Sequence, residues 1–310
     1  MSCGKGKPAD AYRGRFAPSP TGPLHAGSLY TALASYLDAR SRGGLWFLRV
    51  DDLDPLRTRA DSTEQILRCL ESLQLHWDGA VLYQSERLDA YQAALEWLRR
   101  QGLIYPCTCS RRQLESHSRY PGTCRQTEPV SPHPHALRIR VPDRTLSIGD
   151  ELQGLLAVRL DQTRGDFIVY RRDRVYAYHL ATVVDDAHQG ITHIVRGIDL
   201  LDVTPEQAYL RTVLQLSPPA HAHIPVLVDR QGQKLSKQSH APAASTARPS
   251  HLLCRLLTLL KQNPPDDLIQ ETTETVLDWA IRHWDTAPLR GVTRTSLPCT
   301  DDYPAQACPP

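Results

Sequence analysis

A turn rich in proline and glycine, residues 15–28, most constrains how this chain of 310 residues can fold. It reads RFAPSPTGPLHAGS and connects a short apolar run to a helix-like stretch, residues 29–37. A strand, a glycine turn and a helix start form a common anion site of α/β proteins, because free backbone N–H groups and the positive helix end face one point. Gly22 and Gly27 would let the backbone approach a ligand closely. Taken alone, the segment is also compatible with an ordinary structural turn.

A second polar stretch, residues 233–238, reads QKLSKQ and follows an apolar run at 224–228. A Lys-x-Ser-Lys pattern alone is typical of a solvated surface loop. In this order, however, the two stretches resemble the two signature sequences of class I aminoacyl-tRNA synthetases. HAGS at 25–28 stands where the HIGH element would be, KLSKQ at 234–238 stands where KMSKS would be, and RFAPSPTG is the glutamyl form of the first. The resemblance implies an α/β fold, namely a Rossmann-type class I catalytic domain with a zinc-bearing insertion and a helical C-terminal part.

Overall composition excludes some classes of protein. The chain has 36 Lys and Arg against 34 Asp and Glu, a net charge of +2, so any RNA contact must come from a local patch. There is no run of about 18 apolar residues and no apolar signal core at the start, so we expect no membrane span and no membrane partner. Eight unevenly spaced cysteines are typical of one metal site plus scattered thiols in a reducing cytoplasm.

Three of these cysteines, Cys107, Cys109 and Cys124, form a candidate metal site. Two thiolates one residue apart and a third about fifteen residues on suit tetrahedral zinc, with unpaired structural cysteines as the alternative. His117 is the chemically ordinary fourth ligand. The resemblance implies Tyr120 instead, since the fourth ligand in the family is a tyrosine four residues before the last cysteine. We expect one structural zinc ion per chain.

An acidic cluster follows the compact apolar run at residues 45–50. Carboxylates at the C-terminal end of a parallel strand lie where open α/β sheets bind ligands, and Asp51 comes first among them. A helix N-cap is the alternative role for at least one of these aspartates. Related synthetases usually have glutamate at the position of Asp51. The shorter side chain leaves open whether Asp51 meets the substrate directly or through a water molecule.

The apolar periodicity and the loop-forming segments divide the chain into six predicted parts. They are a disordered tail at 1–11, the first half of the catalytic domain at 12–105, the zinc-bearing insertion at 106–160, the second half with the KLSKQ loop at 161–240, a helical C-terminal part at 241–296, and a disordered tail at 297–310.

Over roughly residues 12–290 the chain resembles most closely the glutamyl-Q tRNA(Asp) synthetases, which look like glutamyl-tRNA synthetases without the anticodon-binding domain. About 70 residues follow Lys237, too few for such a domain of typical size. The resemblance assigns catalysis to His25, Lys237 and, secondarily, Lys234, and ATP binding to His25, Gly27 and Lys237. The implied glutamate ligands are Arg15, Phe16, Ala17, Pro18, Ser19, Asp51, Tyr178 and Arg196, with the two arginines on the side-chain carboxylate.

The resemblance implies a ligase that activates L-glutamate with ATP in the absence of tRNA, with Mg²⁺ expected beside the triphosphate. Glutamate would then pass to the cyclopentenediol of queuosine in the anticodon of tRNA(Asp). We expect a cytoplasmic monomer. The alternatives are a shortened glutamyl-tRNA synthetase that charges a tRNA 3′ end, a nucleotidyltransferase that ignores RNA, and a non-catalytic zinc-bearing RNA-binding module.

Overall fold

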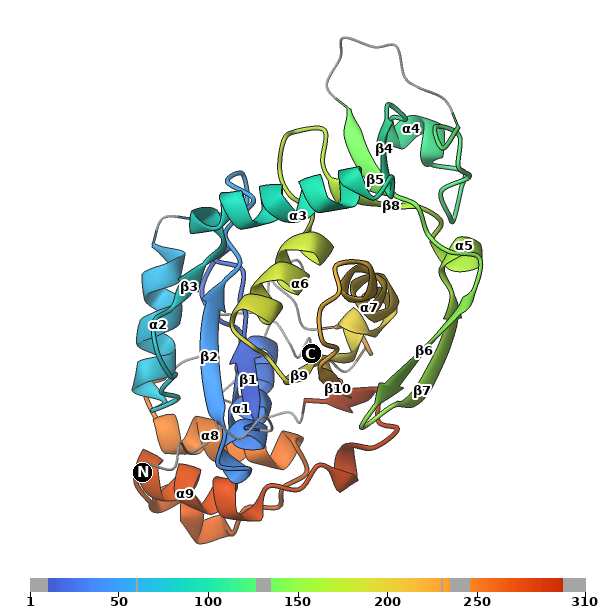
Figure 1. Ribbon diagram of the computed structural model, residues 1–310. Helices are drawn as coiled ribbons and strands as arrows, with labels where there is room; N and C mark the ends of the chain where they lie inside the picture. The colour runs from blue at the N-terminus through green and yellow to red at the C-terminus, as the bar shows by residue number, and fades with distance from the viewer. Residues whose placement is uncertain (1–10, 60, 127–134, 230, 235–245, 298–310) are drawn as a thin grey trace, which may run out of the picture.

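The computed structural model describes residues 11–59, 61–126, 135–229, 231–234 and 246–297. Its first half alternates strands and helices, with α2 on one side of the central strands and α6 and α7 on the other (Figure 1). Among the described helices, none combines the length and the apolar character needed to cross a membrane. Lys237 and most of both predicted tails lie outside the described residues.

The chain begins with three parallel strands and two helices. Their bounds are β1 (Arg13–Phe16), α1 (Ala26–Ser41), β2 (Leu45–Val50), α2 (Ser62–Ser72) and β3 (Leu82–Tyr83), and the strand order is β1-β2-β3. The predicted strand at 45–50 is therefore confirmed. Because the strands are parallel, their C-terminal ends lie at one edge of the sheet, where the turn after β1 and the acidic residues after β2 meet.

Helix α1 is buried on nearly all sides. Leu29, Leu33 and Leu37 are fully buried, and the helix packs against β1, β2 and β9 as well as α8 and α9. A helix between two layers needs apolar residues around its whole circumference, which is why its sequence shows little amphipathic character. The N-terminus of α1 is thereby held rigidly beneath the turn.

Two further sheets follow. The first has the order β4-β5-β8 and is antiparallel; the second has the order β7-β6-β10-β9, in which β6 and β7 form an antiparallel hairpin. The bounds are β4 (Ile104–Cys107), β5 (Ala136–Ile139), β6 (Thr145–Asp150), β7 (Gly154–Arg159), β8 (Phe167–Tyr170), β9 (His193–Gly197) and β10 (Ala220–Ile224). Thr192, just before β9, donates its backbone N–H to Arg13 O at 3.0 Å, which joins this sheet to β1.

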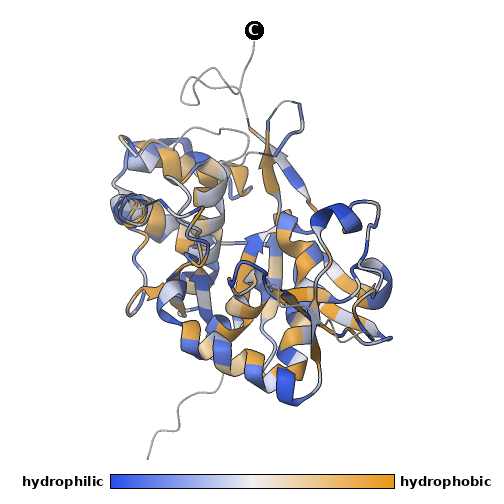
Figure 2. Ribbon diagram, turned by 90° about the horizontal axis from the view of Figure 1, so that it is seen from above, coloured by the Kyte–Doolittle hydropathy of each residue, from blue (hydrophilic) through white to orange (hydrophobic). Residues whose placement is uncertain are grey.

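The remaining helices cover these sheets and build the C-terminal part. They are α3 (Leu88–Arg100), α4 (Arg111–Leu114), α5 (Leu160–Thr163), α6 (Tyr178–His188), α7 (Thr204–Val213), α8 (Pro249–Leu259) and α9 (Thr273–His283). Short 3₁₀ turns are η1 (Gln84–Glu86), η2 (Ile198–Val203), η3 (Asp266–Gln270) and η4 (Ala287–Leu289), and a small parallel pair joins β11 (Val226–Val228) to β12 (Arg294–Ser296). Figure 2 shows apolar residues along the strands and in stripes on the helices.

Strands β5, β6 and β7 lie within the predicted insertion at 106–160. They share sheets with strands outside that range, because β5 pairs with both β4 and β8, and β6 pairs with β10. The predicted insertion is therefore continuous with its flanks, and β4 crosses the predicted limit at residue 106. The six segment boundaries stay predictions.

Candidate active site and metal centre

A pocket of about 350 Å³ lies beyond the C-terminal ends of β1 and β9, against the N-termini of α1 and α6. It brings together ten of the twelve residues predicted for catalysis and for glutamate or ATP binding. They are Arg15, Phe16, Ala17, Pro18, Ser19, His25, Gly27, Tyr178, Arg196 and Lys234. Of the other two, Asp51 is absent from the lining and Lys237 lies outside the described residues.

His25 is the N-cap of α1. Its Nδ1 accepts a hydrogen bond from the Ser28 backbone N–H at 3.3 Å, and its Nε2 lies 3.1 Å from Ser28 Oγ. The ring therefore satisfies one of the amides that a helix start leaves open, while it lines the pocket. Gly27 follows in the first turn, so the positive end of the helix dipole faces the cavity.

Lys234 reaches the pocket from the start of the lysine-rich loop. Its Nζ lies 2.6 Å from Asp199 Oδ2, and both side chains are partly exposed. Asp199 also lies against Gly197, since a Cβ at that glycine would be 2.4 Å from Asp199 Oδ1. The Asp199 carboxylate thus lies close to the end of β9, where it holds Lys234.

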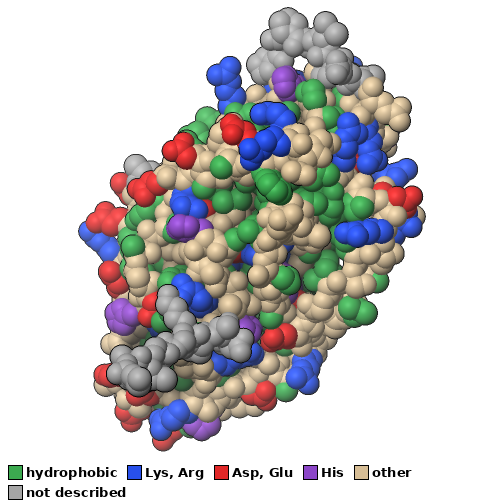
Figure 3. Space-filling model, in the orientation of Figure 1, with side chains coloured by type: hydrophobic (Ala, Val, Ile, Leu, Met, Phe, Trp, Pro, Cys, Tyr) green, Lys and Arg blue, Asp and Glu red, His purple; other side chains and the backbone are tan. Residues whose placement is uncertain are grey.

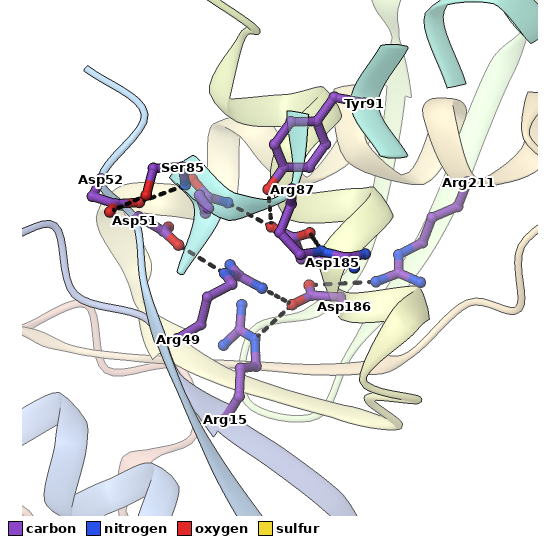
Figure 4. Close-up of polar contacts among 11 residues, drawn as sticks. Arg15, Arg49, Asp51, Asp52, Ser85, Arg87, Tyr91, Asp185, Asp186 and Arg211 are labelled. Atoms are coloured by element: carbon purple, nitrogen blue, oxygen red, sulfur yellow. Dashed lines mark hydrogen bonds and ion pairs between the residues drawn. The ribbon is translucent and has the colours of Figure 1, made fainter. Parts of the chain in front are cut away.

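Behind the pocket, three arginines converge on Asp186 of α6 (Figure 4). Arg49 Nη1 lies 2.6 Å from the carboxylate, Arg15 Nε 3.3 Å and Arg211 Nη2 3.4 Å. All four side chains are buried. Burial alone would raise the pKa of Asp186, but the three guanidinium charges outweigh burial and hold that pKa well below its ordinary value.

The neighbouring Asp185 anchors a second set of partners (Figure 4). Its carboxylate accepts hydrogen bonds from the Tyr91 hydroxyl at 2.6 Å, Gln84 Nε2 at 2.9 Å and Arg87 Nε at 3.1 Å. Two consecutive aspartates of one helix thus tie α6 to the first half of the chain.

Asp51 lies behind the pocket wall. Its Oδ1 accepts a hydrogen bond from Arg49 Nε at 2.7 Å, and its backbone N–H donates to Pro18 O at 3.0 Å. Burial raises the pKa of Asp51, while the charge of Arg49 opposes that rise. The short side chain thus holds Arg49 and the backbone holds the turn, and whether the side chain also meets the substrate stays a prediction.

Arg196 differs from Arg15, Arg49 and Arg211 because its hydrogen-bond partners are neutral. Nε donates to His223 Nε2 at 2.9 Å, and Nη2 donates to Thr204 Oγ1 at 2.9 Å. Nη1 is buried and has no hydrogen-bond partner among the described residues. Burial lowers the pKa of Arg196. Buried donors normally have partners, so Nη1 is the atom through which the predicted contact between Arg196 and a ligand would be made.

The three predicted cysteines form one cluster, with their sulfur atoms all within 4.8 Å of one another. Cys109 Sγ and Cys124 Sγ are 3.5 Å apart, and the Tyr120 hydroxyl lies 3.5 Å from Cys107 Sγ and 4.0 Å from Cys109 Sγ. His117 is exposed and is not part of the cluster. Burial alone would raise the pKa of Cys124, but donors including the Thr108 amide lower that pKa to about 7.

A groove of about 560 Å³ meets the first pocket at Tyr178 and extends toward the cysteine cluster. Six arginines line it, namely Arg57, Arg111, Arg119, Arg138, Arg164 and Arg171. Arginine side chains also gather over the upper part of the molecule, around α4 and α5 (Figure 3). Within the groove, Glu206 pairs with His179 at 3.3 Å, and burial raises the pKa of Glu206 to about 7.

Sequence reasoning missed the residues that support the pocket from behind. Arg49 lies inside the apolar run at 45–50, and a charge inside such a run signals a buried ionic partner. Its partner, Asp186, follows an apolar helical stretch, and its charge there is likewise a sign of a buried ionic partner. For Thr204 and His223, no sequence pattern indicates that they hold Arg196.

A family model described as tRNA synthetases class I (E and Q), catalytic domain, matches residues 11–248. The chain is 50% identical over 280 residues to the glutamyl-Q tRNA(Asp) synthetase of Methylococcus capsulatus. The aligned region covers 90% of this chain and 93% of that protein. The chain is 48% identical to the protein of the same name from Pseudomonas fluorescens, over 90% of this chain and 94% of that one. The solved glutamate-tRNA synthetase of Elizabethkingia anophelis has a TM-score of 0.78 at 24% identity, over 95% of this chain and 69% of that one.

These findings confirm the predicted α/β catalytic fold. They do not assign roles to individual side chains, so the functions of the site residues and the identity of the metal stay predictions.

We expect Asp186→Asn to lower the free energy of unfolding by about 3–5 kcal/mol, because a neutral amide would leave three buried arginines without their shared counter-charge. The folded-state pKa of Asp186 lies below its unfolded value, so this stabilisation is present above about pH 4 and is lost as the pH falls. Urea denaturation of wild type and variant at several pH values measures both effects.

Asp52→Asn is the matched control, since Asp52 accepts its hydrogen bonds from Ser85 at an exposed position. It should cost no more than about 1 kcal/mol. Equal losses in the two variants would contradict the assigned role of Asp186.

Proposed function

Because the chain belongs to the glutamyl-Q tRNA(Asp) synthetase family of class I synthetases, we propose that it activates glutamate with ATP without tRNA and transfers it to the cyclopentenediol of queuosine in tRNA(Asp). Family membership also confirms the resemblance read from the sequence. The observation that carries the proposal is the pocket at the end of β1, where a helix start, Lys234 and Arg196, a buried arginine that forms no ion pair with any described residue, line one cavity.

The pocket chemistry suits activation of an amino acid that has an anionic side chain. Arg15 and Arg196 line the same cavity, and a guanidinium fork matches the geometry of a carboxylate. Ser19 and Tyr178 lie on the lining as well, where they would hold the amino end of glutamate. Glutamine would present a neutral amide to the two cations, so we expect it to be rejected.

In the first step, the α-carboxylate oxygen of glutamate attacks the α-phosphorus of ATP, the bond to the β-phosphate breaks, and pyrophosphate leaves. Negative charge gathers on phosphate oxygens, so fixed cations and N–H dipoles supply most of the stabilisation. We assign this to the start of α1 at His25 and Gly27, with Lys237 as the main cation and Lys234 as the second. Magnesium is expected to bind with the triphosphate. In the second step a queuosine hydroxyl takes the glutamyl group and AMP leaves.

We propose that the cysteine cluster binds one structural zinc ion. Zinc–sulfur bonds of about 2.3 Å in a tetrahedron place ligand sulfurs roughly 3.8 Å apart, and the spacing in the cluster is close to this. The four ligands would be the thiolates of Cys107, Cys109 and Cys124 and the hydroxyl oxygen of Tyr120. Bound zinc would fix the described segment that follows β4, residues 108–126, which has few buried apolar residues of its own.

The arginine-lined groove supports the RNA half of the proposal. Arg57 and Arg164 are 75% and 44% exposed, Arg111 is also exposed, and the groove runs directly into the pocket at Tyr178. Exposed arginines along a cleft are a typical contact surface for a phosphate backbone. We propose that the anticodon stem-loop lies here, with its modified base entering the pocket past Tyr178.

We also propose that the protein works in the cytoplasm as a monomer. The described cysteines are free thiols, as expected in a reducing compartment.

Wild-type protein should catalyse glutamate-dependent ATP–pyrophosphate exchange without any tRNA, and it should glutamylate tRNA(Asp) that carries queuosine. Transfer assays on queuosine-containing tRNA(Asp), queuosine-lacking tRNA(Asp) and tRNA(Glu) distinguish this function from that of a shortened glutamyl-tRNA synthetase. Exchange that requires tRNA, or charging of tRNA(Glu) at its 3′ end, would favour a shortened glutamyl-tRNA synthetase.

For the metal, Cys109→Ser should abolish zinc binding and lower RNA transfer at least as much as glutamate activation. Tyr120→Phe should weaken zinc binding through loss of one oxygen ligand, whereas His117→Ala should not. Elemental analysis of the purified proteins is the measurement, with Cys69→Ser as the cysteine control. Loss of zinc in the His117 variant alone would disprove the tyrosine ligand, and a wild type without zinc would disprove the site.

For the groove, Arg111→Ala should weaken RNA binding and transfer while glutamate-dependent exchange without RNA stays at the wild-type level. The logarithmic salt dependence of RNA affinity should lose about one unit of slope for each phosphate contact removed. Arg282→Ala on α9, another exposed arginine, is the control and should leave the slope unchanged. Identical slopes for the two variants would place the RNA elsewhere.

A further inference from the structure

A buried pair of side chains stands directly behind Arg196. His223 of β10 is fully buried, and its Nδ1 lies 2.5 Å from Oδ2 of Asp150, the last residue of β6. On the other side of the ring, Nε2 lies 2.9 Å from Arg196 Nε and 3.2 Å from Thr204 Oγ1. The ring thus bridges an aspartate and the pocket arginine.

The tautomer of His223 follows from its partners. An arginine Nε can only donate, so the ring atom that faces it must be an unprotonated acceptor. The proton of the neutral ring is therefore on Nδ1, where the Asp150 carboxylate accepts it. Burial lowers the pKa of His223, the hydrogen bond to Asp150 opposes that shift, and the charge of Arg196 acts in the same direction as burial.

The carboxylate of Asp150 is itself fixed. Its Oδ1 accepts backbone hydrogen bonds from Leu152 at 3.0 Å and Gln153 at 2.9 Å. The sequence of contacts therefore runs from a rigid β-hairpin turn, through a ring that has one allowed tautomer, to the Nε of Arg196. A guanidinium group held at Nε and Nη2 has no freedom to rotate, so the direction of Nη1 is also set.

We propose that His223 is a positioning residue that gives the pocket its selectivity for a carboxylate over a carboxamide side chain, by fixing Arg196 through a neutral acceptor. A carboxylate in place of the imidazole would neutralise Arg196 within the protein and remove the attraction for an anionic ligand. A neutral acceptor orients the guanidinium and leaves its charge for the ligand. The inference rests on the proposed function, because it concerns how that pocket recognises glutamate.

Two isosteric variants separate orientation from folding. In His223→Asn, the amide N–H₂ stands near the former Nδ1 and can still donate to Asp150, but no acceptor reaches Arg196. In His223→Gln, the amide oxygen can stand near the former Nε2 and accept from Arg196. His221→Asn is the matched control, because His221 lies on the same strand, is also buried, and stacks parallel to His223 at 6.0 Å.

The measurements are glutamate-dependent exchange and calorimetric binding of glutamate and glutamine without ATP. We expect His223→Asn to raise the KM and the Kd for glutamate about tenfold or more, as for loss of one hydrogen bond to a charged group, with the KM for ATP unchanged. The preference of the His223→Asn variant for glutamate over glutamine should also fall. The His223→Gln variant should recover much of that preference. The His221→Asn variant should have the same preference as wild type.

A double-mutant cycle tests whether His223 acts through Arg196. In an Arg196→Ala background, His223→Asn should cause no further loss of glutamate affinity. If His223→Asn instead caused a general structural defect, its loss of affinity would add to the loss caused by Arg196→Ala. Additive losses, or equal effects of the Asn variants at 221 and 223, would overturn the inference. If wild type shows no glutamate-dependent exchange, the proposed function fails, and calorimetric binding by the same variants still decides the role of His223.

Discussion

The carboxylate of Asp186 is the contact on which the pocket depends. It lies on α6, and its three arginine partners come from β1, β2 and α7, so one buried charge joins elements from both halves of the chain. Burying three guanidinium groups is unfavourable unless a carboxylate and further hydrogen bonds compensate. Because Arg15 is both a partner of Asp186 and part of the pocket wall, the correct packing of α6 against the strands also sets the ligand site.

The cysteine cluster is tied to the rest of the molecule by backbone fit. Gly165 has a φ of +69°, and a Cβ there would lie 2.4 Å from Tyr120 O, so only glycine lets the cysteine-bearing loop approach the turn before β8. Beside it, Asp166 accepts hydrogen bonds from the Tyr105 hydroxyl at 2.6 Å and the Val141 backbone at 2.8 Å. The cysteine-bearing loop and the groove therefore share one rigid base, so under the proposed function a metal ion bound by the cysteines would influence how RNA is held.

Sequence patterns predicted the features that lie within a short stretch of chain and missed the contacts between residues far apart in the sequence. The turn at 15–28, the strand at 45–50 and the cysteine spacing are each contained in a short stretch, so periodicity, loop residues and the family resemblance predicted them. Arg49 pairs with Asp186 across 137 positions and Asp150 with His223 across 73. Such pairs depend on which strands become neighbours, and a single sequence does not encode that in any local signal. Asp51 is an intermediate case, because the resemblance identified the position, whereas its bond to Arg49 is visible only in the folded chain.

The distribution of counter-charges explains why the pocket suits an anionic ligand. Arg15 has part of its charge balanced by Asp186, and Arg49 has two carboxylate partners, Asp51 and Asp186. Arg196 is as deeply buried, but among the described residues it donates to a ring nitrogen, a hydroxyl and a backbone carbonyl, all of them neutral. A buried charge with neutral partners gains most when a carboxylate arrives, because water cannot screen the interaction. A neutral amide would form the same hydrogen bond but would not balance the charge. Recognition of glutamate would therefore depend on where the protein omits an acidic partner as much as on where it supplies a cation.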